Sequence, residues 1–240
     1  MRTIDSINID ESLVETCISR FKHLRLLNLR YSKLETLSSS IGTLKHLRYL
    51  NLCGNRKIKK LPNSICNLQN LETLILLQCE DLEELPRDIR KMVSLRHFVI
   101  ATKQMRLPAN GIECMSSLRY LSFYKCPRLE CFNEGIQRLT ALRHLSFLFC
   151  ESLISLPQEW LPDLSSLRTL QILFCPKLSS LPEGMDRLTA LRELHIVGCP
   201  ELRRDYEREV AKIGARWSNS VLRIRCSWEI VLSEKDVPCA

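Results

Sequence analysis

Apolar residues recur along the chain in a unit of the form L-x-x-L-x-L, where x is any residue. The unit begins at eight positions separated by 23 to 25 residues: Leu24, Leu47, Leu71, Leu95, Leu118, Leu142, Leu167 and Leu191. All three anchor positions of every unit hold Leu, Ile or Phe. Because alternate side chains of a strand point to opposite faces, the L-x-L part predicts a short strand with one face in the core. Self-similarity at this period indicates stacked units that bury their apolar faces against each other.

The second half of each unit repeats as well. A Leu-Pro pair recurs at 61–62, 85–86, 156–157 and 181–182, and an apolar pair such as Ile65 and Leu68 follows it. These positions fit the leucine-rich repeat, in which an irregular or helical return arm follows the strand. We therefore predict an α/β fold, a leucine-rich-repeat solenoid over 23–202 with a curved parallel sheet on its concave face.

The two ends of such a stack expose core and need caps. Apolar residues at helical spacing predict an N-terminal capping helix within 1–22, and Ser12 with Glu15 is expected to form a capping box at its start. We assign 203–240 to a C-terminal cap and tail that includes a final strand at 221–224.

Strand residues between and beyond the anchors point away from the core and line the concave face. In the later units many of them are apolar or aromatic, which marks a contact site on a surface that faces water. The expected partner-binding residues are Tyr124, Leu148, Phe149, Leu173, Phe174, His195 and Val197. For Phe149 and Phe174 a second interpretation stays open, in which both rings fold into the turn after the strand and are half-buried.

Positive charge is concentrated near the N-terminus. The net charge of the chain is +8, and 20–60 alone holds eleven Lys or Arg against one acid, Glu35. We interpret this segment as a docking surface for an acidic protein partner, built from Arg25, Arg30, Lys45, Arg48, Arg56, Lys57, Lys59 and Lys60. The alternatives are a solvated basic patch and a nucleic-acid-binding or nuclear-localisation segment. No aromatic residue for base stacking interleaves the basic cluster at 56–60, where such a signal would lie, and this disfavours nucleic acid.

Cysteine fills one position of the repeat in five units, at Cys79, Cys126, Cys150, Cys175 and Cys199, and Asn55 holds the same position in the second unit. We predict a structural role, in which a small, weakly polar side chain fills the turn and bonds nearby backbone. The alternative is a metal or redox site. A straight column with one ligand per unit does not surround a metal ion, which favours the structural role.

No arrangement of residues in the sequence indicates catalysis. The five histidines lack cysteine or carboxylate neighbours at ligand or triad spacing, so we expect surface roles for them. The seven glycines form no phosphate-binding loop. We therefore expect no enzyme activity, no cofactor and no metal. The chain shows no apolar leader, no apolar run long enough to cross a bilayer and no N-glycosylation acceptor, so we expect no membrane partner and a cytoplasmic location, with the nucleus as the alternative.

Several phrases of the sequence are specific: IGTLKHLRYL (41–50), KKLPNSIC (59–66), LPRDI (85–89), CPKLSSLP (175–182) and CPELRRDY (199–206). They resemble the leucine-rich repeats of plant coiled-coil nucleotide-binding disease resistance proteins (NLRs), and the resemblance covers nearly the whole chain. It implies a non-enzymatic recognition and autoinhibitory module. The partners it implies are a pathogen effector or a guarded host protein, and a nucleotide-binding switch domain on which the basic early repeats dock.

The sequence departs from that family in one respect, because the coiled coil and the nucleotide-binding domain are missing from it. We therefore expect a fragment or a truncated receptor and assign no nucleotide switching to this chain. The alternative function is a signalling scaffold that resembles the leucine-rich-repeat proteins which assemble small GTPases with phosphatases. Repeats of that class are more uniform than the 23 to 25 residues found here, which favours the receptor.

Overall fold

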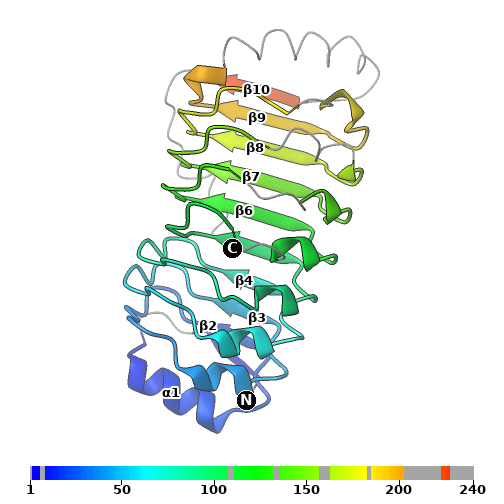
Figure 1. The fold of residues 1–240 in the computed structure, drawn as a ribbon. Coiled ribbons are helices and arrows are strands. Elements are labelled where there is room, and N and C mark those ends of the chain that lie inside the picture. The colour runs from blue at the N-terminus through cyan, green and yellow to red at the C-terminus, as the bar shows by residue number, and fades with distance from the viewer. Residues whose placement is uncertain are drawn as a thin grey trace.

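The computed structural model is a stack of parallel strands, each lying beside the strand one repeat earlier (Figure 1). It describes residues 2–5, 9–107, 111–131, 136–156, 163–182, 185–202 and 223–227. Within these residues ten strands form one sheet in chain order: β1 (Thr3–Asp5), β2 (Leu26–Asn28), β3 (Tyr49–Asn51), β4 (Thr73–Ile75), β5 (His97–Ile100), β6 (Tyr120–Tyr124), β7 (His144–Leu148), β8 (Thr169–Leu173), β9 (Glu193–Val197) and β10 (Arg223–Ser227). The predicted leucine-rich-repeat solenoid is confirmed.

Equivalent positions of successive units pair across the sheet. Leu27 of β2 pairs with Leu50 of β3, which in turn pairs with Leu74 of β4. All anchors of the eight units are buried, and the rings of Phe123 and Phe147 stack with their centroids 5.4 Å apart. Full burial of an apolar side chain of this size contributes about 1.5–3 kcal/mol. The repeated anchor columns therefore hold the stack together.

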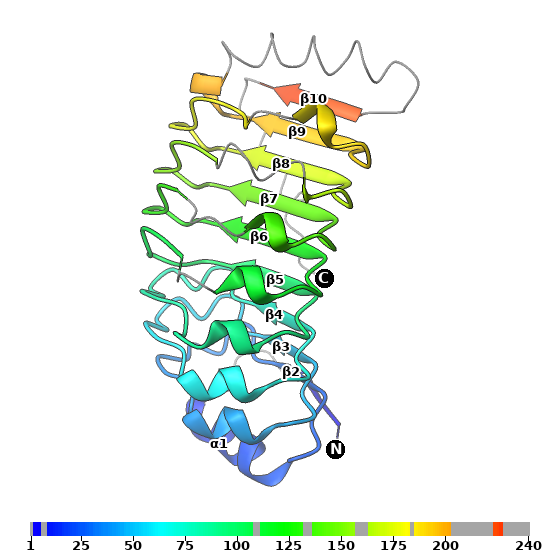
Figure 2. The same cartoon turned by 45° about the vertical axis from the view of Figure 1, so that its right-hand side comes forward.

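The return arms contain short 3-10 helices, which Figure 2 shows stacked from one unit to the next. They are η1 (Ser39–Thr43), η2 (Asn63–Asn67), η3 (Ile89–Lys91), η4 (Ile112–Cys114), η5 (Ile136–Arg138), η7 (Met185–Arg187) and η8 (Pro200–Leu202). Ile65 and Leu68, one of the predicted apolar pairs, are fully buried, and the N–H of Leu68 donates to the carbonyl of Ile65. A 3-10 helix has about three residues per turn, so two residues three apart face the same side.

The N-terminal end holds the helix α1 (Glu11–Arg20), as expected, but the predicted capping box is wrong. The residue before the helix, Asp10, accepts from the N–H of Leu13 at 2.8 Å, and the hydroxyl of Ser12 donates to the same carboxylate at 2.7 Å. A carboxylate is a strong acceptor whose charge suits the positive end of a helix, so Asp10 is the cap. The strand β1, which the sequence analysis does not predict, precedes this helix and pairs with β2.

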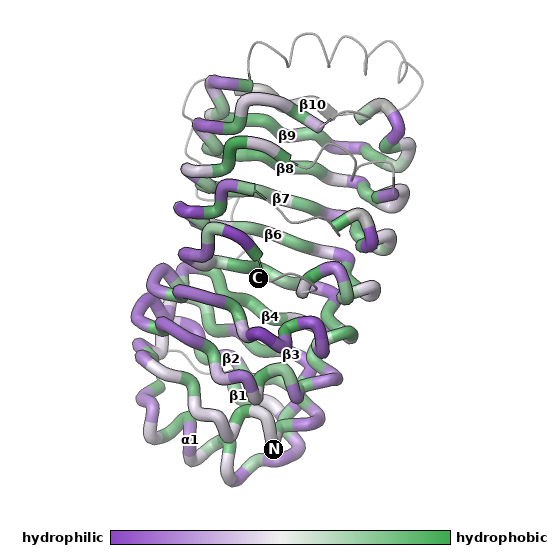
Figure 3. The backbone as a smooth tube through the Cα atoms, in the orientation of Figure 1, coloured by the Kyte–Doolittle hydropathy of each residue, from purple (hydrophilic) through white to green (hydrophobic). Residues whose placement is uncertain are grey.

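At the other end, β10 continues the sheet in parallel with β9. It overlaps the predicted final strand at 221–224, of which the first two residues lie outside the described part of the chain. The segments 203–222 and 228–240 also lie outside it, so the C-terminal cap stays a prediction. Apolar residues follow the strands, whereas polar ones gather in the turns along both edges of the sheet (Figure 3). No helix among the described residues is long and apolar enough to cross a membrane.

Candidate protein-binding face

Three columns of side chains cover the concave face, because the first, third and fifth residues of a strand point away from the core. In β7 these are His144, Ser146 and Leu148, whereas Leu145 and Phe147 between them are fully buried in the core. The strands pair in register, so each repeat adds one side chain to each column.

An apolar cluster separate from the main core lies on this face. Its buried members are Cys53, Leu77, Tyr124 and Leu148, and the partly buried side chains packed against them are Ile75, Val99, Phe149 and Leu173. The cluster extends further toward the N-terminus than the predicted partner-binding residues, the first of which is Tyr124. The sequence analysis missed Ile75 and Val99 as contact residues, although both occupy the position between two anchors of their unit.

The structure brings four of the seven predicted partner-binding residues into the apolar cluster: Tyr124, Leu148, Phe149 and Leu173. His195 and Val197 are half-buried in β9, the strand that follows β8 in the sheet, and they continue the second and third columns. The predicted residues on the strands therefore share one face, and their role in binding stays a prediction.

Phe149 and Phe174 lie in the turns directly after β7 and β8, with φ values of 57° and 55°. Both are half-buried, as in the second interpretation. Their rings stack at a centroid distance of 4.9 Å and an interplanar angle of 9°, and Tyr124 meets Phe149 edge-on at 5.8 Å. Gly198 holds the same position one repeat later, where a Cβ would lie 2.5 Å from the Phe174 ring. The two rings thus form the border of the concave face along one edge of the sheet.

A second group of rings occupies the first column and was not predicted. Tyr120 stacks on His144 at 4.2 Å with an interplanar angle of 3°, and His97 lies 6.2 Å from Tyr120. Burial lowers the pKa of His144 to about 4, with a smaller contribution from His195. Its Nε2 atom is buried and has no hydrogen-bond partner among the described residues. The ring is therefore neutral at pH 7 and more enclosed than the predicted surface role implies.

The predicted basic docking residues do not lie on one surface. Three precede strands at one edge of the sheet (Arg25, Lys45 and Arg48), four follow β3 at the opposite edge (Arg56, Lys57, Lys59 and Lys60), and Arg30 follows β2 on the concave side. Four of them pair with acids of a neighbouring repeat: Arg48 with Glu72 at 3.0 Å, Arg56 with Glu80 at 3.9 Å, Lys57 with Glu35 at 2.8 Å and Lys60 with Glu84 at 3.5 Å. Part of the positive charge is thus neutralised locally, and a docking role for these residues stays a prediction.

The cysteine column is buried and bonded to backbone, which confirms its predicted structural role. The thiol of Cys79 donates to the carbonyl of Leu52 at 3.3 Å, and that of Cys150 to the carbonyl of Phe123 at 3.9 Å, in each case one repeat earlier. Burial raises the pKa of Cys79 to about 12, so its thiol is protonated at neutral pH. Throughout the described ranges no three His, Cys, Asp or Glu side chains come together as metal ligands.

A family model described as a leucine-rich repeat region matches residues 1–203. The chain belongs to the leucine-rich-repeat family. The disease resistance protein RGA1 of Solanum bulbocastanum is 46% identical over 59 residues. That match covers 25% of this chain and 6% of RGA1, so the chain corresponds to a small part of this relative. The match confirms the resemblance to plant disease resistance proteins.

Solved leucine-rich-repeat structures share the fold at low sequence identity. The plant peptide hormone receptor RGFR1, solved in complex with RGF2, has a TM-score of 0.57 at 19% identity, over 84% of this chain and 42% of the receptor. The leucine-rich repeat domain of the type III effector XopL has a TM-score of 0.57 at 22% identity, over 90% of this chain and 79% of that domain. Toll of Drosophila, in complex with Spatzle, has a TM-score of 0.60 at 15% identity, over 82% of this chain and 27% of the solved chain.

Proposed function

We propose that the chain is the recognition module of a plant disease resistance receptor of the NLR type, acting in the cytoplasm. Its concave face binds a protein, either a pathogen effector or a host protein that an effector modifies. The observation that carries the proposal is the apolar cluster on a sheet face that is turned to water. The partial match to RGA1 supports the link to disease resistance.

The concave face suits binding through side chains. The parallel ladder from β1 to β10 uses the backbone groups of the inner strands, so a partner gains no strand pairing there. Val99, Phe149 and Leu173 are each half-buried, and covering half of such a side chain contributes about 1 kcal/mol. A partner that covers several of them at once gains enough to offset part of the cost of association.

Two of the structures that share the fold, RGFR1 with RGF2 and Toll with Spatzle, were solved as complexes with a ligand. This supports protein recognition as the use of the fold here. The nucleotide-binding switch is the second partner that we propose, in the same or another chain. Arg25 and Lys45, which precede strands at the same edge of the sheet, form no ion pair with an acid of the described residues and are the basic side chains best placed to contact it.

The test compares one apolar-to-acid change on each face. Leu173→Asp places a charge on the concave face, whereas Ile154→Asp changes an apolar side chain that is 50% exposed on the return arm. The purified chain is screened against an array of secreted pathogen effectors and the host proteins that they modify. For each binding pair we expect Leu173→Asp to weaken the affinity at least tenfold, because an unpaired carboxylate is costly to bury. Ile154→Asp should leave the affinity unchanged.

Circular-dichroism melts of both variants show whether each is folded. The proposal is wrong if no protein of the array binds, or if a folded Leu173→Asp variant binds as well as the wild type. Equal weakening by Ile154→Asp would move the binding site to the return arms.

A further inference from the structure

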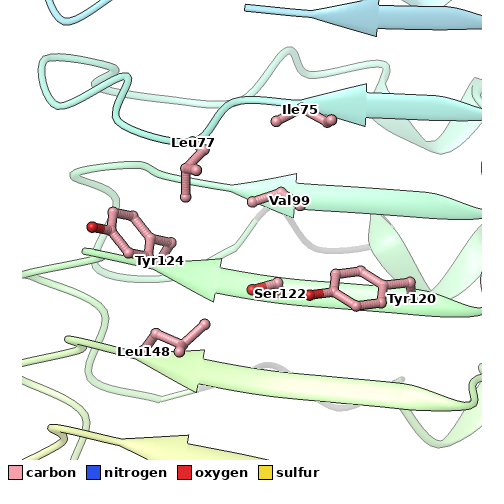
Figure 4. Close-up of a pocket in the computed structure, with 7 residues that line it drawn as sticks. All are labelled: Ile75, Leu77, Val99, Tyr120, Ser122, Tyr124 and Leu148. Atoms are coloured by element: carbon pink, nitrogen blue, oxygen red, sulfur yellow. The ribbon is translucent and has the colours of Figure 1, made fainter. Parts of the chain in front are cut away.

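The middle of the apolar cluster is closely packed. Val99 and Leu148 lie on either side of Ser122 in β6 (Figure 4). The space that these side chains and their neighbours leave open is about 20 Å³, which holds about one water molecule. A partner therefore covers this part of the concave face without entering it, and a recess for one of its side chains has to lie elsewhere.

A larger recess lies at the border of the concave face, where the turns after β7, β8 and β9 form an open groove of about 500 Å³. Its apolar lining consists of the rings of Phe149, Phe174 and Pro176 and of Gly198. Both phenylalanines are half-buried and the proline is exposed. The volume lies within the range of ligand sites, about 300–1,000 Å³, so a side chain of a partner fits into this groove.

The two phenylalanines of the groove hold a backbone conformation that suits glycine. Their φ values of 57° and 55° lie in the left-handed region, which costs free energy for any residue with a Cβ. Two other units have glycine at the same position, Gly54 with a φ of 75° and Gly198 with a φ of 67°. The turn itself therefore needs no ring. Strain of this kind is typical of functional sites, and here it places two rings beside the groove.

The column of rings ends at Gly198. Phe149 stacks on Phe174 at a centroid distance of 4.9 Å, and a Cβ at Gly198 would lie 2.5 Å from the ring of Phe174. The eighth unit thus supplies no side chain to cover that ring, and the groove borders it at this end of the column. An aromatic side chain from outside can continue the stack, and aromatic pairs gain more than their buried area alone provides.

Two exposed side chains of opposite charge line the same groove, Glu151 after β7 and Lys177 after β8. Neither forms an ion pair with another residue of the described part of the chain. Neighbouring strands lie about 4.8 Å apart, and alternate residues of an extended segment lie about 7 Å apart on one side of it. One extended segment therefore reaches both charges and carries a ring between them.

We propose that the groove binds an extended segment of the protein partner in which an aromatic side chain stands between a basic and an acidic residue. The ring stacks on Phe174 over Gly198, the basic residue pairs with Glu151, and the acidic residue pairs with Lys177. The proposal deepens the proposed function, on which it rests, because it states the chemistry of one segment that the partner contributes.

Other occupants match fewer of these features. An aliphatic side chain fills the apolar space but has no face to stack on the ring. A segment with charges of one sign on both sides pairs at one end of the groove and is repelled at the other. A small molecule is about 70–90% buried in its site, whereas this groove is open to solvent and suits a chain that runs along it.

The experiment titrates the full chain, labelled for amide NMR, with four acetylated and amidated pentapeptides: KGWGE, KGLGE, KGWGK and EGWGE. KGWGE should bind with a dissociation constant of about 1 mM and shift the amide signals of Phe149, Phe174 and Gly198. KGLGE should bind at least threefold more weakly, because leucine cannot stack on the ring. KGWGK and EGWGE should each bind at least twofold more weakly than KGWGE, because one of their charges is repelled.

The role of the ring is tested by Phe174→Gly, which supplies the residue that two other units have at this position, so the turn should stay folded. It should lower the affinity for KGWGE to that for KGLGE. Tyr31→Gly is the matched control, since Tyr31 has a φ of 56° at the same position of the first unit and lies outside the groove. It should bind KGWGE like the wild type.

The role of the charges is tested by Lys177→Glu, which reverses one exposed charge of the groove. The groove then holds two acidic side chains, so KGWGK should become the tightest ligand, by at least twofold over KGWGE. An unchanged order of the peptides in this variant would overturn the assignment of the acidic residue to Lys177.

The wild type alone overturns the proposal if KGLGE binds as tightly as KGWGE, or if no peptide shifts the three amide signals. Both results stand even where a variant fails to fold. They are also separate from the proposed function, because the comparison of Leu173→Asp with Ile154→Asp measures the binding of whole proteins to the concave face, whether or not their segments enter the groove.

Discussion

Replacing Asn55 with alanine should destabilise the early repeats far more than the same change at Cys79, which holds the equivalent position one repeat later. Asn55 is fully buried. Its amide nitrogen donates to the carbonyls of Leu29 and Leu52, both at 2.8 Å, and its Oδ1 atom accepts from the N–H of Leu34 at 3.1 Å. The thiol of Cys79 donates to the carbonyl of Leu52 at 3.3 Å.

The expected loss follows from the groups that the substitution leaves behind. In Asn55→Ala the carbonyl of Leu29 and the N–H of Leu34 lose these hydrogen bonds in the interior. Each unpaired buried group costs about 1–3 kcal/mol, so the free energy of unfolding should fall by about 2–6 kcal/mol. The carbonyl of Leu52 keeps the backbone N–H of residue 55 at 3.3 Å and adds nothing to the sum. Cys79→Ala removes one weak bond and a small side chain, for which we expect about 1 kcal/mol.

Urea unfolding followed by circular dichroism measures both losses, and Asn55→Cys should fall between them. Because each repeat contacts only its neighbours, hydrogen exchange should also locate the change: amides of 24–60 should lose protection in Asn55→Ala, whereas those of 140–200 should not. A loss in Asn55→Ala no larger than in Cys79→Ala would refute the idea that the asparagine bonds hold the first units together.

Gly54 has a φ of 75°, and a Cβ there would overlap the ring of Tyr31, so Gly54→Ala should lower the free energy of unfolding in urea by about 1–3 kcal/mol. Adding Tyr31→Ala should recover the part due to overlap, and an unchanged midpoint in Gly54→Ala would contradict the left-handed turn. The pKa of His144 is about 4 in the folded chain and 6.5 in the unfolded chain, so between these pH values the unfolded chain binds more protons. The free energy of unfolding should therefore rise with pH across this window, by up to about 3 kcal/mol. Urea unfolding measured from pH 4.5 to 7 should show that His144→Gln loses this rise in the free energy of unfolding, whereas His46→Gln keeps it. Equal pH dependences in the two variants would contradict the assignment of the rise to His144.

The repeat anchors could be predicted because each anchor position meets the same environment in every unit. A slip of one residue would turn Leu50 and Leu52 to solvent, so the alternation in the sequence specifies strand and register together. The helix cap could not be predicted as well. Asp10 and Ser12 are both good capping residues, so residue type alone does not decide between them. The choice depends on where the chain ends β1, a strand that precedes the repeats and that their period does not predict.

The columns of the concave face follow from the same alternation, but the contacts within it do not. Leu77 and Tyr124 join one cluster although they belong to units two repeats apart. The stacking of Tyr120 on His144 depends on side-chain rotamers that the pattern leaves open. The change from the branched Val99 to the small Ser122 at paired positions of β5 and β6 likewise becomes visible only when the two strands are placed side by side.

The neighbours of a charged side chain also become visible only when the repeats are stacked, because in a solenoid the nearest charges lie one repeat apart and not next to each other in sequence. The basic segment 20–60 is followed by 61–90, which contributes to the next repeats of the stack and holds six acids and two bases. Lys60 and Glu84 are direct neighbours in adjacent return arms and form an ion pair at 3.5 Å. Exposed pairs contribute only about 0.2–1 kcal/mol, but an acidic partner still has to compete with Glu84 for Lys60. For the docking that we propose, we therefore expect the contact at the opposite edge, around Arg25 and Lys45, which form no ion pair with any described acid.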